Sequence, residues 1–153
     1  MDWNPDFLDM IAALRKEGAE FLVVGAFALA AHGVPRATGD LDLWVRPGMG
    51  NAERVWRALQ RFGAPVEDAG LTVEDLVNPG MIYQIGQPPR RIDVITVIDG
   101  VSFDEAWPNR VQVTAGGLEF PCLGRGDLVR NKQASGRGKD KADLELLRKA
   151  DPS

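Results

Sequence analysis

The chain has 153 residues, of which 44% are hydrophobic and 26% are charged, and its net charge is −4. This balance is typical of a single soluble globular domain, taken here as residues 1–153, and it excludes disordered, fibrous and collagen-like chains. Cys122 is the only cysteine, which excludes an internal disulfide framework. With one histidine besides, the chain has too few Cys and His ligands for a zinc site of the usual kind. No apolar stretch reaches the roughly 18 residues of a membrane span, and the acidic N-terminus is unlike a signal peptide. We therefore expect a cytoplasmic protein with no membrane partner.

Apolar periodicity and turn residues predict the elements in chain order. Asn4 and Pro5 predict the start of a first helix, and Gly18 its end. Helices are expected at residues 5–17, 26–31, 55–62, 127–135 and 139–149, with short ones at 72–75 and 102–105. Strands are expected at residues 21–24, 41–45, 81–85, 92–98, 111–115 and 118–120, the last four forming two hairpins. Early and late helices with strands between them predict an α/β (α+β) domain with a central mixed β-sheet flanked by helices.

The charge is distributed unevenly along the chain. Residues 1–124 carry −7, residues 125–149 carry +4, and Asp151 makes up the rest. The acidic total argues against a general DNA-binding protein, whereas a basic helical segment at residues 124–149 beside an acidic body suits a phosphate ligand held with metal ions. An ordinary solvated helix face is the alternative interpretation.

Two aspartates alternate at the start of the second predicted strand. Because alternate side chains of a strand share a face, Asp40 and Asp42 point the same way with their backbones roughly 7 Å apart, while Leu41 and Leu43 point to the other side. Carboxylate oxygens at this separation suit a hard divalent cation such as Mg²⁺. A solvated strand end is the commoner setting of such a pair when it occurs alone.

A glycine separates the first predicted strand from the helix that follows it. The helix beginning after Gly25 offers unpaired backbone N–H groups and the positive end of its dipole, and glycine allows a phosphate to approach the backbone. Taken alone, such a glycine is more often a turn residue than part of a phosphate site.

A third acid, Asp93, interrupts an otherwise apolar strand. A carboxylate there needs a cation, a hydrogen-bond donor or water, because burying it without a partner is costly. If its strand lies next to that of Asp40 and Asp42, the three carboxylates form a cluster able to hold two metal ions. The simpler interpretation pairs Asp93 with Arg90 or Arg91.

The order strand, glycine, helix, D-x-D strand and later aspartate strand resembles the nucleotidyltransferase superfamily that includes DNA polymerase β. The residues that carry the resemblance are Val24-Gly25-Ala26-Phe27-Ala28, His32-Gly33-Val34-Pro35-Arg36-Ala37-Thr38-Gly39-Asp40-Leu41-Asp42-Leu43 and Arg91-Ile92-Asp93-Val94-Ile95. Late elements at 127–132 and 136–140 look like those of the AbiEii-like toxins of its small prokaryotic branch. The resemblance spans roughly residues 20–148. It departs at Ala26, where the family usually has Ser or Gly.

The resemblance implies that a nucleoside monophosphate is transferred from an NTP with Mg²⁺ or Mn²⁺ as cofactor. By resemblance, and consistently with the strand geometry, Asp40, Asp42 and Asp93 are expected to bind the metals, and Asp93 also to assist deprotonation of the acceptor hydroxyl. The backbone N–H groups of Gly25 and Ala26 are expected to contact phosphates, and Arg36, Thr38, Lys132 and Arg137 are the remaining candidates for nucleotide binding. For Arg36 a structural ion pair, and for Thr38 a capping role, are the alternatives.

Two further residues have both a structural and a functional interpretation. His32 is better explained as a partner of its helix C-terminus or as a packed imidazole than as a general base. Trp44 shares the strand face of Asp42, where filling a groove beside the sheet is commoner than stacking on a nucleobase.

The sequence leaves the acceptor open between a tRNA, a protein and a small molecule. The chain has little beyond a catalytic core, so the acceptor is small, is bound by loops such as 63–80, or is met at a homo-oligomer interface. The toxin of a toxin–antitoxin pair, with an antitoxin partner, and an antibiotic-modifying enzyme are the two candidate roles. A catalytically silent nucleotide-binding or partner-binding module and a phosphohydrolase are the competing functions.

Overall fold

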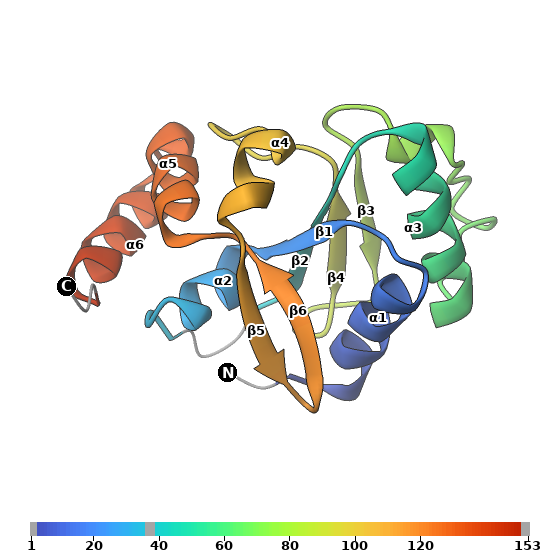
Figure 1. Ribbon diagram of the computed structural model, residues 1–153, viewed down its shortest axis with the longest axis horizontal. Coiled ribbons are helices and arrows are strands. Elements are labelled where there is room, and N and C mark those ends of the chain that lie inside the picture. The colour runs from blue at the N-terminus through green and yellow to red at the C-terminus, as the bar shows by residue number, and fades with distance from the viewer. Residues whose placement is uncertain (1–2, 36–38, 151–153) are drawn as a thin grey trace.

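The computed structural model describes residues 3–35 and 39–150, which form a mixed sheet with helices on both sides (Figure 1). The helices are α1 (Pro5–Lys16), α2 (Gly25–Ala31), α3 (Met49–Phe62), α4 (Phe103–Ala106), α5 (Arg125–Ser135) and α6 (Gly138–Lys149), with 3-10 turns η1 (Glu74–Leu76) and η2 (Trp107–Asn109). The strands are β1 (Phe21–Val24), β2 (Leu41–Val45), β3 (Ile82–Ile85), β4 (Ile92–Ile95), β5 (Val111–Ala115) and β6 (Leu118–Cys122). The predicted mixed sheet flanked by helices is confirmed.

Within the described residues, the sheet has six strands in the order β3-β4-β2-β1-β6-β5. The β3–β4 and β5–β6 pairs are the predicted antiparallel hairpins, and β1 pairs antiparallel with β2. The two remaining contacts, β2 with β4 and β1 with β6, are parallel. Both hairpins therefore dock onto the central β1–β2 pair from opposite sides.

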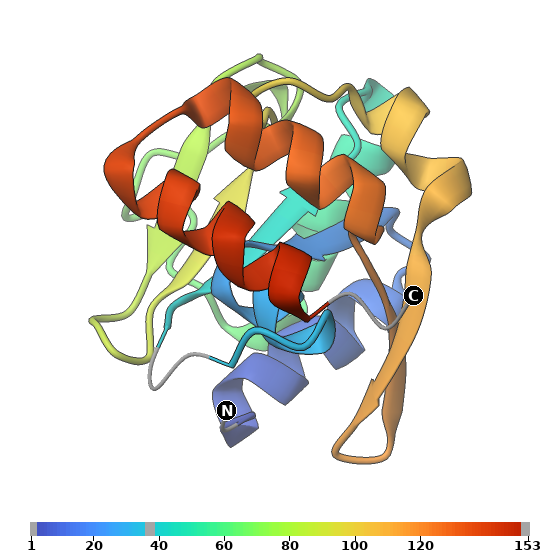
Figure 2. The same ribbon diagram turned by 90° about the vertical axis from the view of Figure 1, so that its left-hand side faces the viewer.

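Helices cover the two faces of the sheet in different ways. Figures 1 and 2 place α1 and α3 on one side of the sheet and α5 and α6 on the other. Strand alternation sends the buried side chains of Leu41, Leu43 and Val45 away from Asp42, into a core shared with α1 and α3. The opposite face carries Asp42, so the polar residues of the central strands lie on the side of α5 and α6.

Local capping explains where several elements begin. The Asn4 side chain accepts a hydrogen bond from the Phe7 N–H at 3.0 Å, which starts α1 as predicted. Ser102 and Glu105 form the reciprocal capping box at the start of α4. None of the helices in the described part of the chain is long and apolar enough to cross a membrane.

Helix α3 begins at Met49, six residues before the predicted 55–62, and β3 begins at Ile82, one residue later than predicted. Two strands also end at residues other than those predicted. The strand expected at 92–98 ends at Ile95, because the chain then leaves the sheet and Asp99 is held by α5 through Asn131. The last strand continues past Phe120 to Cys122, because it pairs in parallel with Val23 of β1. Both differences arise from partners that are distant in the sequence.

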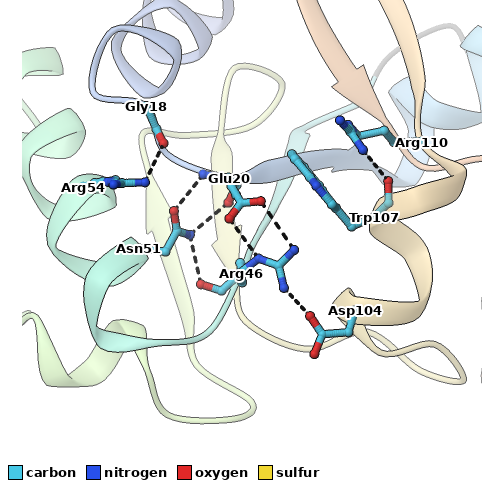
Figure 3. Close-up of polar contacts among 8 residues, drawn as sticks. All are labelled: Gly18, Glu20, Arg46, Asn51, Arg54, Asp104, Trp107 and Arg110. Atoms are coloured by element: carbon cyan, nitrogen blue, oxygen red, sulfur yellow. Dashed lines mark hydrogen bonds and ion pairs between the residues drawn. The ribbon is translucent and has the colours of Figure 1, made fainter.

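Arg46 closes the end of β2 that lies away from Asp42 (Figure 3). Its guanidinium pairs with Glu20, 3.1 Å from Nε, and with Asp104, and it lies 4.6 Å from the centre of the Phe103 ring. From α3, the Asn51 side chain hydrogen-bonds the backbone of Glu20 at 2.7 and 2.9 Å and the Arg46 carbonyl at 3.0 Å. These contacts tie β1, β2, α3 and α4 together at one end of the sheet and leave the other end to the carboxylates.

Candidate functional site

The two acidic strands lie side by side. Asp42 of β2 and Asp93 of β4 are register partners in a parallel pair, so both side chains leave the same face of the sheet. Asp40 immediately precedes β2, and all three carboxylates line one pocket. The adjacency on which the three-carboxylate prediction depends is therefore present.

Arg91 lies between these carboxylates. Its Nε donates to Asp93 Oδ1 at 2.8 Å, and its Nη2 lies 3.2 Å from Asp93 Oδ2 and 3.0 Å from Asp40 Oδ2. The hydrogen bond to Asp93 raises the pKa of the guanidinium, so Arg91 stays charged. Of the two arginines considered from the sequence, Arg91 is thus the one that pairs with Asp93, and it bridges Asp93 to Asp40.

Asp42 has a carboxyl group that its surroundings perturb strongly. Burial, followed by the negative charges of Asp93 and Asp40, raises the pKa of Asp42 from 3.8 to about 7, while Arg91 acts in the opposite direction. A hydrogen bond between the Asp42 and Asp93 side chains adds to the rise. The site therefore holds more negative charge than Arg91 alone neutralises.

This donor set suits a divalent cation, although its present arrangement is that of an ion-paired cluster. Among the residues that the structure describes, no group of three or more His, Cys, Asp or Glu side chains has the arrangement of a metal site. The guanidinium of Arg91 occupies the space between Asp40 and Asp93 instead. Carboxylate oxygens are nevertheless the ligands that Mg²⁺ prefers, and a cation would favour the charged form of Asp42, which burial and the neighbouring acids disfavour.

Gly25 permits the helix start to approach Asp42. It has φ +69°, follows the Val24 that pairs with Asp42, and is the first residue of α2. A Cβ built on Gly25 would lie 2.2 Å from Asp42 Oδ2, so the Asp42 carboxylate would have to move. Gly25 and Ala26 both line the pocket beside the carboxylates. The strand, glycine and helix order read from the sequence thus brings this backbone onto the acidic cluster.

Helices α5 and α6 form the opposite, basic wall of the pocket. Lys132 Nζ lies 3.3 Å from Asp140 Oδ1 and 3.2 Å from Asp143 Oδ2, and Arg137 Nε lies 2.8 Å from Asp140 Oδ2. Burial lowers the pKa of Lys132, with Asp140 opposing that effect. For Asp140, burial raises the pKa but the hydrogen bonds from Arg137 and Lys132 outweigh it, so the net pKa is lowered. Asp140 therefore contacts both Lys132 and Arg137 and holds their charged groups close together.

The pocket collects the predicted site residues that the structure describes. Its volume is about 640 Å³. It is lined by Gly25, Ala26, Asp40, Asp42, Asp93, Lys132 and Arg137. Predicted residues Arg36 and Thr38 lie outside the described residues. Segments from both ends of the chain, separated by more than a hundred positions in the sequence, therefore meet at one site.

Sequence reasoning missed several residues of this pocket. The bridging position of Arg91, two residues before Asp93 on the same face, could have been read from strand alternation. Asn131 and Lys139 lie within the late elements that the resemblance singled out but were given no role, and no sequence signal distinguishes Ser135 from other polar helix positions. The aliphatic residues of the pocket, Ile82, Ile95, Val97 and Ile98, look like core in the sequence.

The two residues with competing interpretations take structural positions. His32 follows α2, and its Nε2 is 2.7 Å from the Leu123 carbonyl oxygen. Trp44 is 1% exposed, donates to the Thr96 carbonyl oxygen at 3.2 Å and packs edge-on against Phe103. Neither lines the pocket, so Trp44 fills the groove beside the sheet.

The overall architecture is shared with solved structures of other proteins. One is TM1012 of Thermotoga maritima, described as a candidate nucleotidyltransferase, with 17% sequence identity, a TM-score of 0.57 and coverage of 97% of this chain and 94% of that one. Another is the lincosamide antibiotic adenylyltransferase LnuA with lincomycin bound, with 8% identity, a TM-score of 0.58 and coverage of 97% and 98%. No protein-family model matches the sequence, and no curated protein matches it. The chain thus has the nucleotidyltransferase fold that the sequence resemblance predicted.

Proposed function

We propose that this chain is a metal-dependent nucleotidyltransferase that transfers a nucleoside monophosphate from an NTP to a hydroxyl acceptor. The observation that carries the proposal is the convergence, in one pocket, of three carboxylates, a glycine-led helix start and two paired cations. In the reaction, a bond forms between the acceptor oxygen and the α-phosphorus, the bond to the bridging oxygen breaks, and pyrophosphate leaves. A charge-rich pocket suits this chemistry, because phosphoryl transfer depends mainly on positioning and charge stabilisation.

The basic wall and the start of α2 are assigned to the phosphates. The backbone N–H groups of Gly25 and Ala26 donate to β- and γ-phosphate oxygens, and Lys132 and Arg137 supply positive charge. Lys132 is held in place by buried Asp140 and Asp143, so its ammonium needs little reorganisation when the nucleotide binds. Arg36 and Thr38 are proposed to contact the same phosphates.

The carboxylates are assigned to the metals and to the acceptor. Asp40, Asp42 and Asp93 would hold Mg²⁺ or Mn²⁺, which neutralises triphosphate charge and lowers the pKa of the attacking hydroxyl. Asp93 accepts the hydroxyl proton. Before ligands bind, Arg91 neutralises Asp40 and Asp93 and keeps them close together.

The alternative is a catalytically silent nucleotide-binding or partner-binding module with the same fold. Ala26 favours it, because the hydroxyl of the usual serine is absent at the phosphate site. The Arg91 bridge also favours it, because the carboxylates have a protein partner without any metal. Binding of NTP without transfer is the result expected of this module.

Two biological roles are proposed for such a transferase. LnuA, which shares the fold, is by its name an adenylyltransferase of lincosamide antibiotics, and it makes an antibiotic-modifying role one candidate. The toxin of a toxin–antitoxin pair is the other, supported by the motif resemblance alone. Both roles are consistent with a single cytoplasmic domain over residues 1–153, whose acceptor site is completed within one chain or in a homo-oligomer.

The test is transfer of label from an NTP radiolabelled at the α-phosphate, in the presence of Mg²⁺ and a cell extract as the source of acceptors. We expect a labelled product in the wild type, and a loss of at least ~100-fold in Asp42→Asn, the size typical of removing a group that stabilises transferred charge. Asp9→Asn, an exposed carboxylate on α1, is the control. Equal rates in both variants would contradict the proposal, and free phosphate without a labelled acceptor would indicate a phosphohydrolase.

A further inference from the structure

An aliphatic strip lines one side of the pocket, outside the proposed phosphate and metal sites. It consists of Ile82, Ile95, Val97 and Ile98. Ile82 is 62% exposed and Val97 is 49% exposed, although large apolar side chains are normally buried. Among the described residues, only Met49, Val111 and Leu146 are comparably exposed large hydrophobics. A cluster of such side chains at a pocket marks a binding surface.

The strip is continuous with the carboxylates. Ile95 follows Asp93 by two positions in β4 and so shares its face, and Ile82 of β3 is the register partner of Ile95. In Figure 2, the turn between α5 and α6 lies on the same side of the molecule as β3 and β4. A molecule resting on Ile82 and Ile95 would therefore extend toward the Asp93 carboxylate.

The strip is held in a fixed position relative to α5. Asn131 Nδ2 donates to the Asp99 carbonyl oxygen at 2.9 Å, and Ser135 Oγ lies 3.1 Å from Asp99 Oδ2. Gly100 packs so closely on α5 that an added Cβ would lie 2.6 Å from that of Ala134. The loop that carries Val97 and Ile98 is therefore positioned before any ligand binds, which lowers the entropy cost of binding.

The chemistry of the strip restricts what it can bind. It offers aliphatic surface and no charge, whereas α5, α6 and the turn between them supply Lys132, Arg137 and Lys139 to the same pocket. A triphosphate belongs with the cations. A nucleic acid on the strip would place its phosphates near Asp93 and Asp99 without any lysine or arginine among the strip residues.

We propose that the strip is the acceptor subsite, and that the acceptor is a small molecule with an aliphatic surface that carries a hydroxyl group. The aliphatic part packs on Ile82, Ile95, Val97 and Ile98, and the hydroxyl reaches Asp93. This inference rests on the proposed nucleotidyl transfer, and it selects the small molecule from the three acceptor classes that the sequence left open.

The experiment is an NMR titration of the full chain, isotope-labelled at the methyl groups of Ile and Val. The probe is cyclohexanol, compared with glycerol as a hydroxyl compound without aliphatic surface and with a short single-stranded RNA. We expect cyclohexanol to shift the Ile82, Ile95 and Val97 methyl signals, and glycerol and RNA to leave them unchanged. Ile82→Glu should weaken cyclohexanol binding at least ~10-fold, because it replaces apolar contact by a charge. The control is Val111→Glu, at an exposed apolar position of β5 outside the pocket, which should change the affinity for cyclohexanol less than about twofold.

Three results would overturn the inference. The first is that cyclohexanol leaves the strip methyl signals unshifted, and the second is that RNA shifts them more than cyclohexanol does. The third is that the base of a non-hydrolysable Mg–NTP analogue shifts them, because the strip would then be a nucleobase subsite. Binding of the same analogue, followed by calorimetry, tests the proposed function separately. If the analogue does not bind at all, the proposed function fails. If it binds while cyclohexanol leaves the strip unchanged, only the acceptor assignment fails.

Discussion

Asp42 combines burial with two neighbouring acids. Its pKa of about 7 means that the folded chain keeps this proton while the unfolded chain loses it near pH 3.8. The contribution of Asp42 to the free energy of unfolding is therefore fully present below pH 3.8, where the group is protonated in both states, and it is lost as the pH rises through about 7. Each pKa unit corresponds to about 1.4 kcal/mol, so this carboxyl group is a substantial source of strain at neutral pH.

We predict that Asp42→Asn stabilises the metal-free protein at pH 8 and has little effect at pH 4. The amide keeps the shape of the side chain and removes the charge that burial disfavours and that Asp93 and Asp40 repel. Chemical denaturation in a chelator at both pH values measures this. A stability gain that is the same at pH 4 and pH 8 would contradict the electrostatic explanation.

Gly25 offers a steric test with a matched control. Gly25 and Gly18 both have φ +69°, but only Gly25 has a neighbour, Asp42 Oδ2 at 2.2 Å from an added Cβ, whereas Gly18 has nothing within 4 Å. Alanine at either position costs ~1 kcal/mol of backbone strain. We predict that Gly25→Ala in addition displaces Asp42 and weakens Mn²⁺ binding at least ~10-fold, as losses of supporting contacts at metal sites do.

The measurement for the glycine pair is an Mn²⁺ titration followed by electron paramagnetic resonance, alongside unfolding curves. Gly18→Ala should lower stability only. If Mn²⁺ affinity were equal in the two variants, the close approach of Gly25 to Asp42 would have no role in the site.

Helices α5 and α6 are held together by charges that are largely removed from water. Asp140 is fully buried and Asp143 nearly so, and both rely on Lys132. Removing one partner of a buried ion pair leaves an uncompensated charge, which is far costlier than losing an exposed pair. The basic segment noted in the sequence is thus partly neutralised within its own helices.

We predict that Lys132→Met lowers the free energy of unfolding by ~3–5 kcal/mol. Arg137→Met should cost less than ~1 kcal/mol, because the Arg137 side chain is 60% exposed and Lys132 continues to pair with Asp140. Urea denaturation of the two variants at neutral pH measures the difference. Equal destabilisation would show that the burial of Lys132 does not decide its structural role.

At the scale of elements, the sequence predicted the ends of helices and strands correctly where they depend on neighbouring residues. Asn4 and the Ser102–Glu105 capping box marked their helix starts correctly, because both motifs act within one turn of the chain. The ends of β4 and β6 were misplaced by two or three residues, because Asp99 is held by α5 and Cys122 pairs with β1. A strand ends where its pairing ends, and the partner is not visible in a local pattern.

At the scale of the molecule, the candidate site depends on a sheet whose order does not follow the chain. The order β3-β4-β2-β1-β6-β5 places Asp93 beside Asp42 across a parallel contact, and it brings α5 and α6 over the same face. The far end of β2 is closed by Arg46, Glu20 and Asp104 (Figure 3), so the two ends of the central strands have separate roles. The carboxylates of the candidate site, with Arg91, gather at one end, and the ion pairs of Arg46 lie at the other.

The sequence by itself determined the alternation of Asp40 and Asp42, the glycine at the start of α2, the helix caps and the resemblance that predicted the fold. Each of these depends on residues a few positions apart, or on a motif read directly. Only the tertiary structure decided that Asp42 and Asp93 are neighbours, that Arg91 bridges Asp40 to Asp93, and that the aliphatic strip lines the same pocket as the cations of α5 and α6. Alternation fixes the face of a strand on which a side chain lies, but strand order fixes what lies beside it, and that order is set by packing of the whole chain.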